Sequence, residues 1–213
     1  MSTFEMPLSI DDYKKLFGKV KLANYDAKQK FDTGYNFCQE LKEKRIKYFT
    51  CITHPEVLSS LDSEMYYTQY SDLFGKDYSV CKHLFVHERK GLKRHFLIIV
   101  DNEKDVDLKK LKEELDLSKL EFCSEDELKQ LLNTIPGNVS LFHTKFDQND
   151  KVNLIIDREL LDRELLAFHP LYNGMSLFLT PECALKYLSS INKEAHFYTI
   201  PSKNDYSLLE KVL

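Results

Sequence analysis

The apolar residues of this chain fall into short runs separated by polar, turn-forming stretches. Two runs, Val80–Val86 and His95–Asp101, are rich in β-branched residues, which is the pattern of buried strands. The connector Glu88–Arg94 is polar and contains a glycine, so we expect the two strands to form a hairpin. Further strands are predicted at Lys47–Thr53, Val139–Phe142, Val152–Asp157 and Ser176–Thr180.

Other segments carry apolar residues at helical spacing, or begin with helix-starting residues. Ser124 and Glu127 match a capping box, in which each side chain satisfies a backbone amide at the start of a helix. Pro181 suits the first turn of a helix because its missing N–H needs no partner there. Helices are predicted at Ile10–Phe17, Thr33–Lys44, Leu58–Leu73, Asp107–Leu115, Ser124–Asn133 and Pro181–Ser190, with a short turn or helix at Arg158–Leu161.

Strands and helices interleave irregularly, with hairpins among them and no internal repeat. We therefore expect an α+β fold in which helices flank a curved, mixed and largely antiparallel sheet. The 213 residues suffice for one well-buried core. We assign this core to residues 32–190. Residues 1–31 form a polar, Lys-rich extension, and 191–213 form a tail to which the sequence gives no structure.

Composition narrows the class of protein. With 43% hydrophobic and 30% charged residues, the chain resembles soluble globular proteins. Five cysteines without CxxC spacing indicate reduced thiols, and no signal peptide or apolar run of about 20 residues is visible. We therefore expect a cytoplasmic protein that does not bind membranes. A net charge of −4 argues against coating of nucleic acid by bulk charge.

Lys82 is the least expected residue in the predicted strands, because burying an unpaired ammonium costs several kcal/mol or more. It is either an edge lysine with its head in water, or a cation at the floor of a pocket that donates to a substrate oxygen. Gly137 also has two interpretations. It is either the left-handed residue that ends a helix, or a position where a ligand approaches the backbone amides.

The remaining candidates for chemistry are weaker. His54 and His169 each precede a proline, and a lone histidine is more often structural than catalytic. The histidines and cysteines lack metal-ligand spacing, and no nucleotide-binding glycine loop is present, so we expect no metal and no cofactor. A basic cluster on the hairpin is either a solvated turn or a grip on phosphates; it consists of Arg89, Lys90, Lys93 and Arg94.

Four motifs in a fixed order carry a resemblance to a known family. They are His54-Pro55, Cys81–Gly91 followed by HFLIIVD, Leu131–Phe142 and Leu154–Pro181. Together, from about Thr33 to Ser190, they resemble the YbaK/ProX family of aminoacyl-tRNA deacylases. This family includes the editing domain of bacterial-type prolyl-tRNA synthetases and free-standing proteins associated with those synthetases.

The resemblance implies hydrolysis of the ester that joins an amino acid to the 3′ end of a mischarged tRNA, and we expect alanyl-tRNA(Pro). It places catalytic roles on Lys82, Gly137 and His169. Because the basic cluster continues the strand that carries Lys82, we expect this cluster to contact the tRNA. The substrate-binding residues that the resemblance implies are His54, Asn138, Val139, Ser140, Phe142, Asn173 and Ser176. The chain departs from the family pattern at Leu141, where proline is frequent, and at Ser176, where threonine is more usual.

An activated ester needs only a positioned water and charge stabilisation. In the mechanism that the resemblance implies, Lys82 anchors the terminal nucleotide, amides near Gly137–Ser140 polarise the carbonyl, and the ribose hydroxyl assists the water. Two alternatives stay open. The chain is a non-catalytic module that binds tRNA or prolyl-tRNA synthetase, or it is the editing domain of a larger synthetase. A generic hydrolase is disfavoured because no nucleophile motif is visible.

Overall fold

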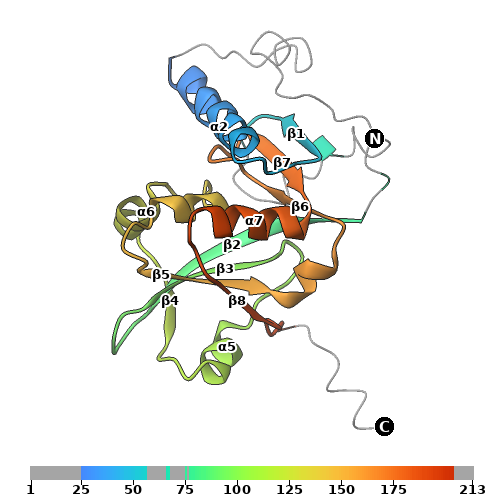
Figure 1. The fold of residues 1–213 in the computed structure, drawn as a ribbon. Helices are drawn as coiled ribbons and strands as arrows, with labels where there is room; N and C mark the ends of the chain where they lie inside the picture. The colour runs from blue at the N-terminus through green and yellow to red at the C-terminus, as the bar shows by residue number, and fades with distance from the viewer. Residues whose placement is uncertain (1–24, 57–65, 68–74, 76, 204–213) are drawn as a thin grey trace.

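The computed structural model describes residues 25–56, 66–67, 75 and 77–203, and these form a mixed sheet with helices packed on it (Figure 1). The helices are α2 (Tyr25–Glu43), α5 (Leu108–Glu114), α6 (Glu125–Leu132) and α7 (Pro181–Ser190), with the 3-10 helices η2 (Leu141–Phe146) and η3 (Arg158–Asp162). None of the helices in these ranges is both long and apolar enough to cross a membrane.

The strands are β1 (Thr50–Thr53), β2 (Tyr78–Glu88), β3 (His95–Asp101), β4 (Leu120–Phe122), β5 (Val152–Asp157), β6 (Leu165–Phe168), β7 (Met175–Leu179) and β8 (Ala195–Tyr198). Their spatial order is β1-β7-β6-β2-β3-β5-β8, with β4 beside β2. Four contacts are antiparallel (β1–β7, β6–β7, β2–β3 and β2–β4), and three are parallel (β2–β6, β3–β5 and β5–β8). The predicted fold class is therefore confirmed.

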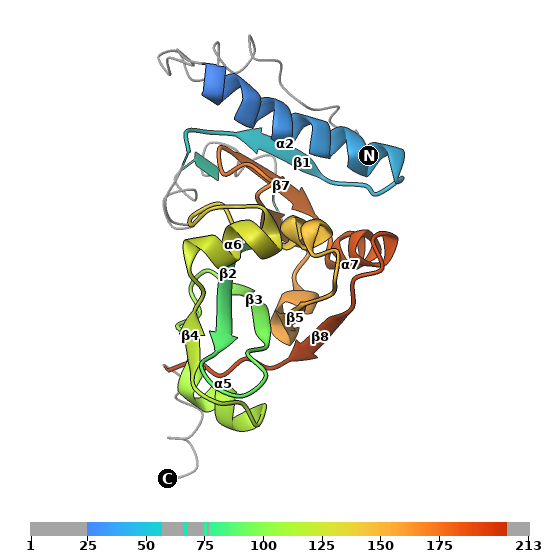
Figure 2. The ribbon, with the colours of Figure 1, turned by 90° about the vertical axis from the view of Figure 1, so that its left-hand side faces the viewer.

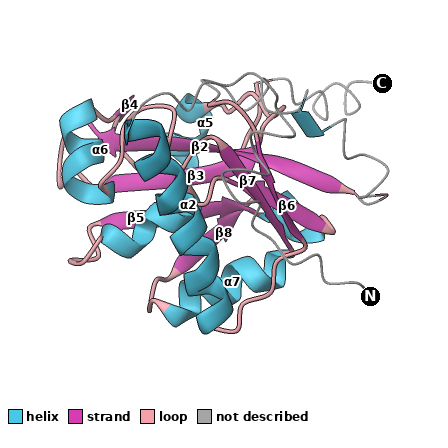
Figure 3. Ribbon diagram, turned by 90° about the horizontal axis from the view of Figure 1, so that it is seen from above, coloured by secondary structure: helices cyan, strands magenta, loops and turns pink. Residues whose placement is uncertain are grey.

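The side chains on the two faces of the sheet belong to separate hydrophobic clusters, because successive strand residues point to opposite sides. Leu97 and Ile99 of β3 join the large cluster, which also contains residues of α2, α6 and α7. Ile98 and Val100 join a smaller cluster with Leu111 of α5. Figure 2 shows α6 and α7 together, with α5 at the other end of the molecule from α2. In Figure 3, which looks down on α2, this helix lies across the strands.

Several predicted elements form where expected. Helix α7 has the predicted bounds, and α6 begins at the predicted capping box, with Ser124 and Glu127 bonded reciprocally. Helix α5, strand β5 and the hairpin of β2 and β3 are also present, and η3 forms at the predicted short helix. The predicted helices at Ile10–Phe17 and, apart from 66–67, at Leu58–Leu73 lie outside the described residues.

Other predictions were wrong in position or type. The predicted strand Val139–Phe142 is instead the start of η2, because the Ser140 side chain caps this helix. The helix expected from Thr33 already begins at Tyr25, within the stretch that we assigned to an extension. The expected tail begins with β8, which pairs with β5 and places Ile200 in the core. Strands β4 and β6 were not predicted, since each is only three or four residues long.

Candidate active site

The glycine turn after α6 is docked on the turn that follows β6. Gly137 has φ +80°, a left-handed conformation that glycine adopts without steric cost. Its carbonyl accepts a hydrogen bond from Nδ2 of Asn173 at 3.3 Å, and Nδ2 of Asn138 donates to the Leu171 carbonyl at 3.1 Å. The structure thus brings Gly137, Asn138 and Asn173 together, as the sequence led us to expect.

Two of the four backbone amides from Gly137 to Ser140 are available to donate a hydrogen bond to a ligand oxygen. The amide of Asn138 donates to the Ile135 carbonyl, and the amide of Ser140 donates to Nδ1 of His143 at 3.1 Å. Among the described residues, the amides of Gly137 and Val139 have no hydrogen-bond partner. The expectation that Ser140 offers its amide to a substrate is therefore corrected. The free donors alternate along the turn.

His169 stands at the start of the second turn, and within the described residues one of its ring nitrogens has no hydrogen-bond partner. Its Nδ1 lies 3.0 Å from the Met175 carbonyl, which can only accept, so Nδ1 carries the proton and Nε2 keeps its lone pair. Burial lowers the pKa of His169, which keeps the ring neutral at pH 7. Leu171, two residues on, has φ +62°, an uncommon conformation that the two docked turns hold in place.

Three further imidazoles surround His169. The ring of His54 has its centroid 6.3 Å from that of His169. Burial, with a smaller contribution from the nearby His169, lowers the pKa of His54 to about 4, of His83 to about 3 and of His143 to about 4. His169 is thus the shared neighbour of the other three. Sequence reasoning missed His83, although it lies within the Cys81–Gly91 motif, and His143, because nothing in their spacing indicates that they meet His169.

His54 and Ser176 belong to a buried chain of hydrogen bonds. His54 Nδ1 donates to the Pro55 carbonyl at 2.8 Å, so its Nε2 accepts from the Ser176 hydroxyl at 2.9 Å. The Ser176 oxygen lies 2.6 Å from the Tyr67 hydroxyl, which then donates to it. Because all three side chains are almost fully buried, they shape and hold the region around His169.

Two of the predicted substrate-binding residues, Phe142 and Ser140, are fully buried. Phe142 packs against Phe37, Phe168 and Tyr187, so it is a core residue. The Ser140 hydroxyl accepts from the Phe142 amide at the start of η2. Leu141, which stands where the family pattern has proline, is fully buried as well. Val139 is half-buried beside the large cluster.

The structure does not bring the Lys82 ammonium to Gly137 and His169. In the sheet, β2 lies between β6 and β3. The β2–β6 pairing ends with Val80 opposite Ala167, so Lys82 and His169 each come two residues later. The Lys82 side chain, however, lies on the α5 face of the sheet, as does that of its β3 partner Val100, whereas the docked turns pack beside the large cluster on the other face. Its Nζ donates to the carbonyls of Asn102 at 3.0 Å and Lys104 at 2.6 Å, and its third N–H has no partner in the described ranges.

The basic hairpin divides into paired and free cations. Arg94 donates twice to the buried carboxylate of Glu88, at 2.7 and 3.1 Å, so its guanidinium holds the hairpin together. Arg94 therefore has a structural partner, and its contact with tRNA stays a prediction. Arg89 lies 3.5 Å from Glu121, and is largely exposed. Lys90 and Lys93 are exposed, and in the described part of the chain their ammonium groups have no ion-pair partner.

Three hollows on the described surface lie away from these turns. One is between α7 and β8, one is between α6 and the loop after η2, and one is beside α5. None of the three is lined by Gly137 or His169. The candidate site is thus defined by the free amides and the free ring nitrogen of the two docked turns.

Comparison with known proteins decides the family. The model of the aminoacyl-tRNA editing domain matches residues 72–187, a range that includes both docked turns. The chain belongs to the aminoacyl-tRNA editing domain family. The predicted resemblance is confirmed, and with it the assignment of the chain as an aminoacyl-tRNA deacylase.

Individual members support this membership. The chain is 34% identical over 143 residues to the prolyl-tRNA editing protein ProX of Acetoanaerobium sticklandii. The aligned residues cover 67% of this chain and 82% of that protein. Two solved structures have a similar fold at low sequence identity. One, assigned as a trans-editing enzyme for prolyl-tRNA synthetase, has a TM-score of 0.52 and 15% identity over 78% of this chain and 95% of its own. The other, the hypothetical protein APE2540, has a TM-score of 0.52 and 13% identity over 75% and 96%.

Proposed function

We propose that this deacylase removes alanine from alanyl-tRNA(Pro) and that the reaction occurs at the docked turns of Gly137 and His169. The similarity to a prolyl-tRNA editing protein supports the choice of tRNA. The observation that carries the site is the pair of free amides, Gly137 and Val139, held beside a neutral His169. Association with prolyl-tRNA synthetase, which would supply the mischarged tRNA, is part of the same proposal.

The free amides suit the charge that develops during ester hydrolysis. When water attacks the ester carbonyl, its oxygen gains negative charge, and preformed N–H donors stabilise this charge more than they stabilise the substrate. In our proposal the amides of Gly137 and Val139 donate to this oxygen. Asn173 and Asn138 hold the turn in place, so the donors need not reorganise during the reaction.

His169 would act through its unprotonated Nε2. As a neutral acceptor, this nitrogen can orient the attacking water or the terminal ribose hydroxyl, and the Met175 carbonyl fixes the tautomer that leaves it free. His54, Ser176 and Tyr67 would keep the ring in place from behind. No strong protein base is required, because an aminoacyl ester is already activated.

The need for a second site that separates amino acids by size follows from the limits of the synthetase site. A synthetase site built for proline cannot strongly reject a smaller residue, since one methylene is worth only about 1–3 kcal/mol. A pocket that admits alanine and excludes proline removes the wrong product after it forms.

We keep Lys82 as a proposed anchor of the terminal nucleotide on the basis of the family resemblance. Because Lys82 pairs with Val100, its side chain lies on the α5 face of the sheet, and a change of rotamer alone would not bring its ammonium to the docked turns. Its backbone lies two residues beyond the β2–β6 pairing, as that of His169 does, and two carbonyls hold its ammonium beside the loop after β3. A phosphate or carbonyl of the substrate would compete for this cation. We expect Lys82→Ala to abolish amino-acid release while tRNA affinity stays within a few-fold. If Lys82→Ala releases the amino acid as fast as the wild type, Lys82 has only a structural role, in which it holds the loop after β3.

The substrate is tested with a panel of purified aminoacyl-tRNAs and the full chain. We expect alanyl-tRNA(Pro) to lose its amino acid at least about tenfold faster than prolyl-, cysteinyl- and seryl-tRNA. Tenfold corresponds to about 1.4 kcal/mol, which is within reach of a pocket that discriminates by size. Faster release of cysteine or serine would overturn the choice of alanine. Equal release of proline would overturn size exclusion.

A further inference from the structure

Four side chains of metal-ligating type meet at the far end of the hairpin. They are His87 of β2, His95 of β3, Cys123 after β4 and Glu127 of α6, and one ligand atom from each lies within 4.8 Å of the others. His87 Nδ1 is 2.7 Å and His95 Nε2 is 3.1 Å from the same oxygen, Oε1 of Glu127. All four residues are half-buried, so an ion from solvent can reach them.

The carboxylate of Glu127 is already oriented for binding. Its Oε2 accepts from the amide and the hydroxyl of Ser124, both at 2.8 Å, as part of the capping box. This fixes Oε1 toward the two imidazoles. The hydrogen bonds from Ser124 and the histidines lower the pKa of Glu127 to about 2 although burial opposes them, so the group is a carboxylate at neutral pH. Outer hydrogen bonds of this kind commonly orient metal ligands.

Cys123 is the member that a hydrogen-bonded cluster does not explain. Glu127, His87 and His95 satisfy one another, but within the described residues the Cys123 thiol has no hydrogen-bond partner. Its backbone is held by a bond from its amide to the Phe85 carbonyl. In the described part of the chain, the thiol therefore stands beside two imidazoles and a carboxylate without a hydrogen bond of its own.

We propose that His87, His95, Cys123 and Glu127 bind one divalent transition-metal ion of the zinc type. Two imidazoles, a thiolate and a carboxylate form a donor set that zinc accepts in a tetrahedron. With bonds of about 2.0–2.3 Å, the ligand atoms of such a tetrahedron lie about 3.3–3.7 Å apart. The present cluster is within about an ångström of this spacing, so side-chain rotations suffice to complete it.

Binding would release the thiol proton. Burial and the nearby Glu127 raise the pKa of Cys123 to about 12, so the metal-free group is a thiol. Binding of the ion replaces this proton, as is general for cysteine ligands. The sequence led us to expect no metal, because each ligand comes from a different element and no pair has the spacing of a metal motif.

A four-ligand site would be structural. It would tie β2, β3 and the segment after β4 to the first turn of α6. Helix α6 leads within five residues to Gly137, so the ion would also fix the helix that carries the glycine turn. We expect the bound ion to raise the melting temperature, since a ligand that binds only the folded state stabilises it.

The test uses cobalt(II) as a spectroscopic probe with the metal-free full chain. We expect one equivalent to bind, with the visible bands of tetrahedral cobalt and a thiolate-to-cobalt charge-transfer band in the near ultraviolet. Cys123→Ser should lose the charge-transfer band. Cys183→Ser is the matched control, because Cys183 is also half-buried but lies on α7, and it should keep both features.

Zinc should raise the melting temperature of the wild type and of Cys183→Ser, and much less that of Cys123→Ser. Should Cys123→Ser fail to fold, Glu127→Gln replaces it, because glutamine preserves the capping box but removes the charge. Absence of stoichiometric binding to the wild type would overturn the proposal. So would a charge-transfer band that survives Cys123→Ser, since the thiolate would then come from elsewhere.

Discussion

At the residue scale, the region around His169 depends on histidines that are kept neutral by burial. Hydrogen-bond partners fix the tautomers of three of these rings. The Nδ1–H groups of His54 and His169 each donate to a backbone carbonyl, whereas Nδ1 of His143 accepts from the Ser140 amide. The sequence predicted His54 and His169 through their His-Pro motifs. It could not predict His83 and His143, because their meeting with His169 depends on tertiary packing and has no local signature.

Replacement of Ser176 tests the buried hydrogen-bond chain. Ser176→Ala removes the partner of His54 Nε2 and one partner of the Tyr67 hydroxyl, so we expect the free energy of unfolding to fall by about 1–3 kcal/mol. Ser176→Thr keeps the hydroxyl and should cost less than half as much. Urea unfolding measures both. An alanine variant as stable as the wild type would show that these hydrogen bonds do not contribute to the free energy of unfolding.

Replacement of His83 tests the effect of pH on stability. Its Nε2 is buried without a hydrogen-bond partner in the described part of the chain, and its pKa falls from 6.5 to about 3 on folding. The unfolded chain therefore binds a proton that the folded chain refuses, and stability present above pH 6.5 is lost as the pH falls toward 3.

His83→Leu removes this titration. Between pH 7.5 and 5.5, we expect the free energy of unfolding of the variant to fall by about 1 kcal/mol less than that of the wild type. Urea unfolding at both pH values measures this difference. An identical loss in the two proteins would mean that His83 titrates normally in the folded state.

At the element scale, capping chemistry made helices predictable where the signal was local. Ser124 with Glu127 and Thr180 with Pro181 mark the starts of α6 and α7 in the sequence and in the structure. The stretch after Gly137 misled the prediction, because its apolar residues suit a strand as well as a buried 3-10 helix. Strand β8 was missed because it is a short edge strand whose pairing with β5 is set by tertiary structure.

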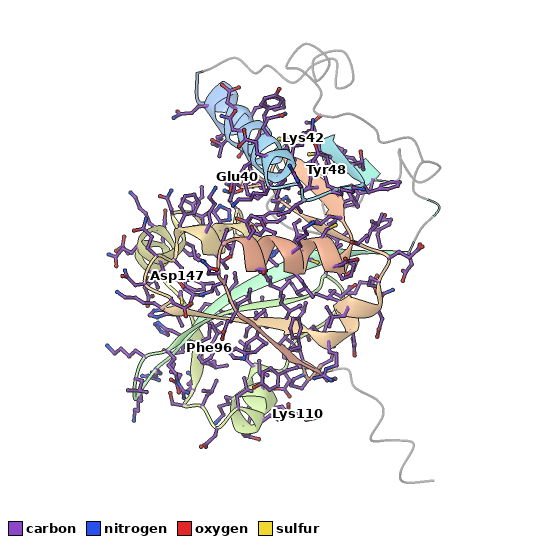
Figure 4. All side chains as sticks on the ribbon, viewed as in Figure 1. Glu40, Lys42, Tyr48, Phe96, Lys110 and Asp147 are labelled. Atoms are coloured by element: carbon purple, nitrogen blue, oxygen red, sulfur yellow. The ribbon has the colours of Figure 1, made fainter. Side chains whose placement is uncertain are left out.

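The hairpin of β2 and β3 carries the prediction for tRNA binding. The double variant Lys90→Gln/Lys93→Gln removes two exposed cations near the tip, so tRNA affinity should fall and its salt dependence should become shallower by about one contact per lysine. Lys109→Gln/Lys110→Gln removes the same charge from exposed positions on α5, where Figure 4 shows Lys110, and should change little. Equal losses would mean that net charge, rather than the hairpin, binds tRNA.

At the scale of the whole molecule, strand order assembles the site. The parallel pairing of β2 with β6 brings the Lys82 region beside the His169 turn, and the contact of Asn173 with Gly137 joins segments 36 residues apart. The sequence predicted a mixed sheet and the motifs on it. It did not predict where the Lys82 ammonium would point, because two backbone carbonyls after β3 compete for it.

The most direct test of the account is the single-turnover deacylation of alanyl-tRNA(Pro) by His169→Ala, beside His196→Ala as a matched control. His196 lies exposed on β8 and belongs to neither the candidate active site nor the proposed metal site. The account predicts that His169→Ala, folded as judged by its unfolding transition, releases alanine at least about tenfold more slowly, while His196→Ala keeps the wild-type rate. A His169→Ala variant that deacylates as fast as the wild type would contradict the assignment of the active site.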